Sequence, residues 1–171
     1  MNRLVVAVAA TALSVAFAAG ARADPKEVRL GGDGGYALLA GSESMSGYGF
    51  GVRAAYGLTW EITLVLEARY SKHLPATKHG QMVAVLSGVE WALDVLRFVP
   101  FFSVETGAYF AQDPAFGSTT DVGLSVGIGV DYRVNRSFSV GLYGRYHLVL
   151  SNVNKFPAYV DSGLRFAFHF D

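Results

Sequence analysis

The side chains that could take part in catalysis are few and widely separated in this sequence. His147 and Ser151 are four residues apart in YHLVLSN. On one extended strand they would share a face but lie about 13 Å apart, too far for the hydrogen bond between a nucleophile and its base. Two Lys-His pairs, Lys72-His73 and Lys78-His79, have no adjacent carboxylate and indicate a solvated loop rather than a metal site. The sequence therefore predicts no catalytic residues, no metal site and no cofactor.

Charged residues occupy alternate positions of several otherwise apolar segments. They share their parity with glycine and serine, and acids and bases are about equally frequent among them. Such a balance suits mutual ion pairing, because buried charges are tolerated only when they are paired and hydrogen-bonded. We predict a polar network inside a barrel, with the glycines making room for long arginine side chains. The predicted members are Arg53, Glu67, Arg69, Glu90, Glu105, Asp131, Arg133, Arg145, His147, Asp161 and Arg165.

The elements that would carry this network are strands with two different faces. In residues 121–133, for example, Val122, Leu124 and Val126 alternate with Gly123 and Ser125, which is the two-residue period of a strand. The predicted strands cover residues 34–41, 47–58, 60–71, 80–93, 99–111, 121–133, 137–150 and 158–170. The Gly-rich residues before the first segment could extend it or form a flexible lead. The sequence thus predicts an all-β, eight-stranded antiparallel up-and-down barrel.

Two features favour a membrane barrel: the lengths of the links between these segments, and the positions of the aromatic residues on the apolar parity. Links after the second, fourth and sixth segments are short, whereas those after the third, fifth and seventh are longer, at 71–80, 111–120 and 151–157. Pairs such as Phe102 and Phe110 bracket the apolar stripe over a rise of roughly 20 to 25 Å, close to the lipid-facing band of outer-membrane barrels. A soluble barrel with its apolar parity inward is the alternative.

The first residues have the pattern of a secretory signal peptide. Arg3 precedes an apolar run from Leu4 to Ala19, and small residues lead to a predicted cleavage between Ala23 and Asp24. The predicted domains are therefore a signal peptide at 1–23 and a barrel at 24–171. The formal net charge is zero and the chain has no cysteine, so neither nucleic-acid binding nor a disulfide framework is expected.

The last predicted strand carries the most specific pattern. AYVDSGLRFAFHF ends on alternating aromatics, and its Gly163, Phe166, Phe168 and Phe170 resemble the C-terminal assembly signal of outer-membrane barrels. One residue, Asp171, follows the last aromatic, where that family usually ends. The whole mature chain resembles the small eight-stranded outer-membrane barrels of the OmpA/OmpX type, with OmpW-like relatives as another match.

The resemblance implies a location and a set of partners. It implies the outer membrane of a Gram-negative bacterium, contact with lipid and lipopolysaccharide, and folding through the barrel assembly machinery after transit on periplasmic chaperones. We therefore predict an integral outer-membrane protein with a structural or surface-interaction role and no catalytic activity. Two alternatives remain open at this point: a narrow pore gated by lumen ion pairs, and a soluble periplasmic barrel that binds an apolar ligand.

Overall fold

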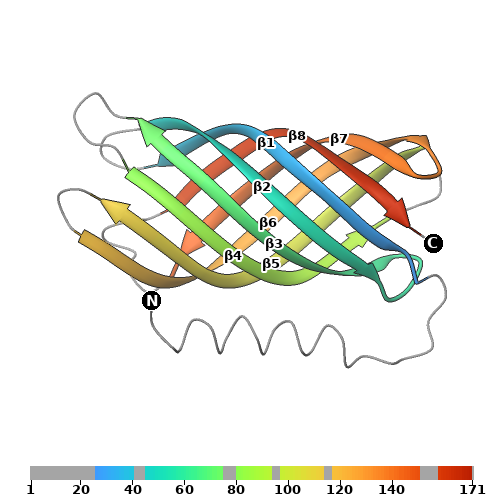
Figure 1. Cartoon of the computed structure of the whole chain (residues 1–171), viewed down its shortest axis with the longest axis horizontal. Helices are drawn as coiled ribbons and strands as arrows, with labels where there is room; N and C mark the ends of the chain where they lie inside the picture. Colours follow the sequence, from blue (N-terminus) through green and yellow to red (C-terminus); the bar gives the residue numbers. More distant parts are fainter. Residues whose placement is uncertain are drawn as a thin grey trace.

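Eight long β-strands account for nearly all of the chain that the structure describes (Figure 1). The structure is a computed structural model, and it describes residues 26–40, 45–74, 80–93, 97–113, 117–150 and 158–170. No helix in these ranges is long and apolar enough to cross a membrane. The strands are β1 (Val28–Ala40), β2 (Met45–Gly57), β3 (Ile62–Leu74), β4 (Gly80–Ala92), β5 (Phe98–Asp113), β6 (Gly117–Asn135), β7 (Phe138–Val149) and β8 (Ala158–Phe170).

The strands form a closed antiparallel barrel in sequence order. Each strand pairs with the next, and β8 closes the barrel by pairing with β1, from Val28 opposite Phe170 to Ala40 opposite Ala158. The strands cross the long axis of the barrel at a tilt, as closure of a sheet requires (Figure 1). The predicted fold class, an all-β eight-stranded antiparallel barrel, is confirmed.

The first strand begins earlier than its alternation predicts. β1 starts at Val28 rather than near residue 34, so the Gly-rich segment is strand and not a flexible lead. Its glycines permit close contact with β8, because a Cβ on Gly35 would lie 2.1 Å from the carbonyl oxygen of Ser162. This extension adds Arg29 and Asp33 to the side chains that face the barrel interior.

Two of the predicted long links are strand in part. Ser71–Leu74 belongs to β3, whereas Ala111–Asp113 and Gly117–Thr120 belong to β5 and β6. Backbone pairing between β5 and β6 continues to Asp113 opposite Gly117, past the Gln and Thr residues that resemble a loop in the sequence. The remaining residues of these two predicted loops, 75–79 and 114–116, lie outside the described residues, as does the predicted loop 151–157. The barrel is extended at this end chiefly by strands; we call it the far end.

The short links at the opposite end are closed by local side chains. In the β2–β3 link the hydroxyl of Thr59 accepts hydrogen bonds from the backbone N–H groups of Glu61 at 3.3 Å and Ile62 at 2.9 Å. In the β6–β7 link the side-chain oxygen of Asn135 accepts from the N–H of Ser137 at 2.9 Å. Serine, threonine and asparagine side chains close turns in this way. We call this end, which also holds Lys26 and Phe170, the short-link end.

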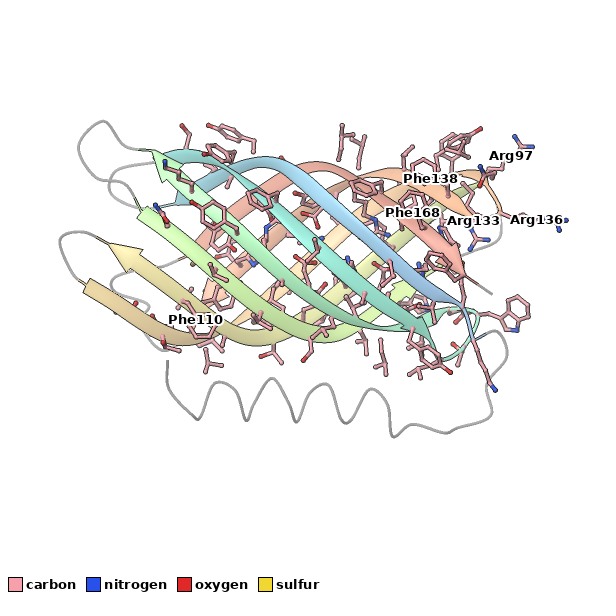
Figure 2. The ribbon with its side chains drawn as sticks, in the orientation of Figure 1. Arg97, Phe110, Arg133, Arg136, Phe138 and Phe168 are labelled. Atoms are coloured by element: carbon pink, nitrogen blue, oxygen red, sulfur yellow. The ribbon has the colours of Figure 1, made fainter. Side chains whose placement is uncertain are left out.

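The outer surface of the barrel is apolar and carries aromatic residues at both ends. At the short-link end Phe138 packs against Phe168, with ring centroids 5.1 Å apart. At the far end Phe50 packs against Tyr70 at 5.3 Å. Figure 2 shows Phe110 at the end of the barrel opposite Phe138 and Phe168. The apolar parity therefore faces outward, the reverse of what a soluble barrel with an apolar ligand inside requires.

Candidate functional site

The inside of the barrel is filled by charged and aromatic side chains. We divide them into three groups along the barrel. The central cluster is Asp33, Glu67, Arg69, Arg145 and Asp161; the Glu90 cluster is Arg29, Arg53, Glu90, Asp131 and Arg165; the mouth cluster, at the short-link end, is Glu27, Arg133, Ser139 and His169.

Two arginines hold the central cluster together. Arg145 pairs with Glu67 and, through its second terminal nitrogen, with Asp33 at 3.1 Å. Arg69 contacts Asp33 and Asp161 and lies 3.6 Å from Glu67. All five side chains are at most 2% exposed. Each guanidinium thus joins carboxylates from different strands, which ties β1, β3, β7 and β8 together across the interior.

Aromatic side chains complete the packing around these charges. The Tyr143 hydroxyl accepts a hydrogen bond from Arg69 at 2.8 Å, and the Tyr143 ring lies 4.6 Å from the guanidinium carbon of Arg145. His147 stacks on Tyr159 with ring centroids 4.1 Å apart and bonds to the Tyr109 hydroxyl at 3.0 Å. Cation–π contacts and stacking of this kind add stability to buried charges.

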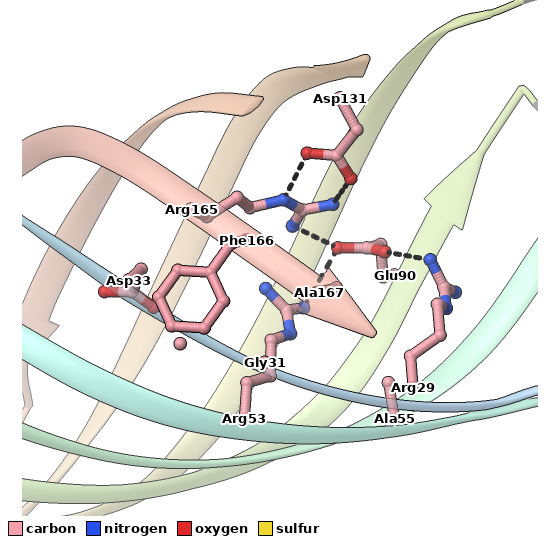
Figure 3. A pocket seen from close by; sticks show the side chains of 11 residues that line it. Arg29, Gly31, Asp33, Arg53, Ala55, Glu90, Asp131, Arg165, Phe166 and Ala167 are labelled. Atoms are coloured by element: carbon pink, nitrogen blue, oxygen red, sulfur yellow. Dashed lines mark hydrogen bonds and ion pairs between the residues drawn. The ribbon is translucent and has the colours of Figure 1, made fainter. Parts of the chain in front are cut away.

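The Glu90 cluster lies between the central cluster and the short-link end (Figure 3). Its centre is the Glu90 carboxylate, which contacts Arg165 at 2.9 Å and Arg53 at 3.0 Å, and lies 3.4 Å from Arg29. Arg165 also donates two hydrogen bonds to Asp131, one of them from Nε at 2.6 Å. Three cations therefore surround one carboxylate whose side chain is only 2% exposed.

These contacts leave little free space between the clusters. The cavity bounded by Arg29, Asp33, Arg53, Glu90 and Arg165 has a volume of about 30 Å³, which holds on the order of one water molecule. Neighbouring side chains occupy the space beside lumen glycines. A Cβ on Gly127, for example, would lie 3.2 Å from Cγ of Arg145. The interior in this conformation is a packed core rather than an open channel.

The structure places most of the predicted network residues inside the barrel. Ten of them, His147 included, are buried or nearly so. The eleventh, Arg133, lies at the short-link end with a third of its side chain exposed. Asp33 and Arg29 were missed because the Gly-rich segment does not have a clear apolar face. Charged residues and glycines share alternate positions here, at Arg29, Gly31, Asp33 and Gly35, and this pattern is the signal that would have found them.

The mouth cluster contains hydrogen bonds that the sequence analysis did not predict. The Ser139 hydroxyl lies 2.9 Å from Nε2 of His169, and Nδ1 of the same ring contacts the Glu27 carboxylate. A carboxylate can only accept, so Nδ1–H donates to Glu27, and in the neutral ring Nε2 accepts from the Ser139 hydroxyl. The three residues come from β7, β8 and the segment before β1.

The strand register explains why these residues meet. Ser139 is opposite Ala167 on β8, so His169 is its diagonal neighbour on the same face. On its other side Ser139 is opposite Arg133 of β6, and His169 is opposite Arg29 of β1. Four lumen-facing side chains from consecutive strands thus form one row around the short-link end.

The mouth cluster lines a cavity of about 380 Å³. Arg29, Arg133 and Arg136 lie in its wall, together with Trp60 and Thr63, and Figure 2 shows Arg133 and Arg136 at this end of the barrel. Arg136 is exposed and forms no ion pair within the described part of the chain. The cavity therefore combines the serine and histidine with several positive charges.

The electrostatics of the cavity keep Glu27 ionised. Burial alone would raise the pKa of Glu27, but the hydrogen bond from His169, the positive charge of the protonated His169 ring and the charges of Arg29 and Arg133 hold the pKa of this carboxyl below its usual range. An ionised Glu27 orients the His169 ring and fixes its tautomer. The described residues include no group of histidines, cysteines and carboxylates that could hold a metal ion.

Comparison with solved structures identifies the fold. Neisserial surface protein A superposes with a TM-score of 0.71 at 17% identity, covering 82% of this chain and 95% of that one. Ail of Yersinia pestis gives 0.61 at 11% identity, covering 85% and 99%. The N-terminal β-barrel domain of Pseudomonas aeruginosa OprF gives 0.60 at 15% identity, covering 85% and 98%. No family model and no curated protein sequence matches the chain.

These similarities establish the architecture. The chain has the fold of the small eight-stranded outer-membrane barrels, as the sequence resemblance predicts. At identities of 11 to 17% the similarity concerns the fold, and a fold hosts many functions. What the protein does must therefore be argued from its own residues.

Proposed function

We propose that the protein is an integral outer-membrane barrel that acts as a rigid scaffold for surface contacts, with the short-link end facing the periplasm. The observation that carries this proposal is the combination of an apolar outer face with an interior filled by ion pairs. An apolar face turned outward is stable only in lipid, and a filled interior gives a stable closed barrel.

The far end is the proposed contact surface. The pairing of β6 with β7 begins at Gly123, and the paired strands β5 and β6 extend beyond that residue at the far end. Lys72 lies on β3 at the same end and would meet phosphate groups of lipopolysaccharide as a point charge. Ail, which has this fold, has been crystallised with the heparin analogue sucrose octasulfate. A polyanion at the cell surface is accordingly the partner we propose first.

The packed lumen argues against the pore as a second function. A conducting path would require the Arg145 and Arg165 ion pairs to break and the free volume to increase well beyond about 30 Å³. We expect purified protein in planar bilayers to show no steady conductance.

Cell fractionation with protease treatment tests the location and the orientation together. The protein should remain in the outer-membrane fraction after carbonate extraction and show heat-modifiable migration. Protease added to intact cells should cleave within 75–79, 114–116 or 151–157, while the short links at 58–61 and 136–137 are cleaved only after the outer membrane is opened. Recovery in the soluble periplasmic fraction would contradict the proposal, and cleavage of the short links in intact cells would reverse the orientation.

The last strand is proposed to serve as the assembly signal as well as the closing strand. Phe170 and Phe98 are both exposed aromatics at the short-link end, at 51% and 62%, but only Phe170 ends the chain's last strand. Phe170→Ala should lower the assembled fraction in cells and leave spontaneous folding in detergent unchanged. Phe98→Ala is the matched control; equal effects of the two substitutions would mean that the aromatic belt, not the signal, is responsible.

The proposed secretion and biogenesis steps complete this picture. We propose cleavage between Ala23 and Asp24, export as an unfolded chain bound to periplasmic chaperones, and insertion by the barrel assembly machinery. Residues 1–25 lie outside the described residues, so this part of the proposal rests on the sequence pattern. Mass determination of the protein from outer membranes gives the cleavage site directly.

A further inference from the structure

We propose that Ser139, His169 and Glu27 form a hydrolytic site at the short-link end of the barrel, which cleaves small esters that carry a negative charge. This inference goes beyond the scaffold role and beyond the sequence-based prediction of a protein without catalytic activity. It rests on the hydrogen-bond order of the three residues and on the cavity that they line.

The hydrogen bonds have the order that an activated serine needs. A nucleophile is recognised by a base within hydrogen-bond reach and by a third group that orients the base. Nε2 of His169 lies 2.9 Å from the Ser139 hydroxyl, and in the neutral ring, whose Nδ1–H is donated to Glu27, Nε2 can take the serine proton. Serine, histidine and carboxylate thus take the roles of nucleophile, base and orienting group.

The cavity supplies space and positive charge beside the nucleophile. It measures about 380 Å³, and Ser139, His169 and Glu27 all lie in its wall. Only 2% of Ser139 is exposed, so a substrate would reach its hydroxyl from the cavity and must be small. Arg133 is directly opposite Ser139 in the β6–β7 pairing, and its guanidinium, 3.7 Å from Glu27, is the group we propose to stabilise a developing oxyanion.

The positive charges select the substrate class. Arg29, Arg133 and Arg136 line the cavity; Arg29 lies 3.4 Å from Glu90 and Arg133 lies 3.7 Å from Glu27, whereas Arg136 forms no ion pair within the described residues. The Asp131 charge is already compensated by two hydrogen bonds from Arg165 on the lumen side. An ester whose acid part ends in a carboxylate fits this lining better than a neutral ester of the same length.

The reaction is an acyl transfer to water. The Ser139 oxygen forms a bond to the ester carbonyl carbon while its proton moves to Nε2 of His169; the bond to the leaving oxygen then breaks, and His169 protonates the departing alcohol. Water next attacks the acyl-serine and gives a proton to His169. The carboxylic acid leaves as the Ser139 oxygen takes that proton back. Glu27 is a positioning residue, since it acts through His169.

Covalent labelling of the folded protein tests the nucleophile. Detergent-folded full-length barrel, treated with a small fluorophosphonate and digested, should carry the phosphonyl adduct on Ser139. Ser137 is the internal control, because it is an exposed serine two residues before Ser139, in the β6–β7 link, and its side chain contacts no histidine among the described residues. No adduct at Ser139, or equal labelling of Ser137, would overturn the proposal and leave the cluster as a hydrogen-bonded latch between β7, β8 and the start of the chain.

Hydrolysis of two chromogenic esters tests the activity and its charge preference. Wild-type protein should cleave 4-nitrophenyl hemisuccinate, and Ser139→Ala should reduce the rate by at least about 100-fold, while Ser137→Ala retains it. Arg136→Gln should raise KM for the hemisuccinate and leave KM for neutral 4-nitrophenyl butyrate unchanged. Wild-type activity in Ser139→Ala that shows normal heat-modifiable migration would refute the nucleophile assignment.

A third set of variants separates positioning from folding. Glu27→Gln should lower kcat about 10-fold or more at unchanged KM, and Glu27→Asp should restore part of kcat. A merely structural role for Glu27 predicts equal loss of folded protein in both variants and the same kcat per folded barrel. The assays use protein folded in detergent, so their outcome is independent of the proposed surface role.

Discussion

Replacing Arg145 by methionine should lower the free energy of unfolding by about 3 to 5 kcal/mol. Arg145 is 1% exposed and supplies a counter-ion to both Glu67 and Asp33. Without it Asp33 keeps Arg69, whereas Glu67 keeps only that same arginine at 3.6 Å. Removing one partner of a buried pair is costly because it leaves an uncompensated charge in a medium of low dielectric constant.

Urea titration of barrels folded in lipid vesicles, followed by tryptophan fluorescence, measures this difference. Arg136→Met is the matched control, since Arg136 is exposed and forms no ion pair within the described residues; it should change the unfolding free energy by no more than about 0.5 kcal/mol. The double variant Arg145→Met with Glu67→Leu should recover part of the loss, because the orphaned carboxylate is removed. A loss below about 1 kcal/mol in the single variant would mean that water replaces the guanidinium and that the lumen is not dry.

Introducing arginine at Leu142 should destabilise the membrane-inserted barrel by about 2 to 4 kcal/mol. Leu142 lies in the middle of β7, is 59% exposed on the outer face, and is flanked by Val130 and Leu164 on the neighbouring strands. A guanidinium at that depth is far from both aromatic ends of the apolar band. Its cost is the transfer of a charge from water into hydrocarbon.

The same substitution near the short-link end provides the comparison. Val134 is 50% exposed and lies next to the β6–β7 turn, so Val134→Arg can extend its charge into the headgroup region and should cost only about 0 to 1 kcal/mol. The two variants are compared by urea titration in vesicles and by the assembled fraction in cells. Equal tolerance of both would be evidence that the outer face of β7 does not contact hydrocarbon, and would count against the membrane barrel itself.

The fold could be predicted because a strand displays its two faces in every second residue. The alternation of Val122, Leu124 and Val126 with glycine and serine already assigns each side chain to one of two faces, and the observed parity agrees. Where the pattern is weak the prediction was incomplete. Glycines at 31, 32, 34 and 35 hide the start of β1, and strand continues into the predicted loops because backbone pairing does not require an apolar face.

The candidate site was less predictable, for a geometric reason. Ser139 and His169 are 30 residues apart and Glu27 is 142 residues from His169, so no local spacing relates them. Only the register of β7 with β8 and of β8 with β1 makes them neighbours. The search for a nucleophile with a nearby base along one strand could consider His147 and Ser151, but not a pair formed across strands.

The sequence by itself determined which side chains share each face of a strand, because the two-residue period of a strand is a local property. It also determined that the lumen charges are balanced, since composition is independent of arrangement. The tertiary structure alone decided which charges pair, how little space remains between them, and that Ser139, His169 and Glu27 share one cavity. Those features depend on barrel closure and strand register, which bring residues from distant parts of the chain within hydrogen-bond distance.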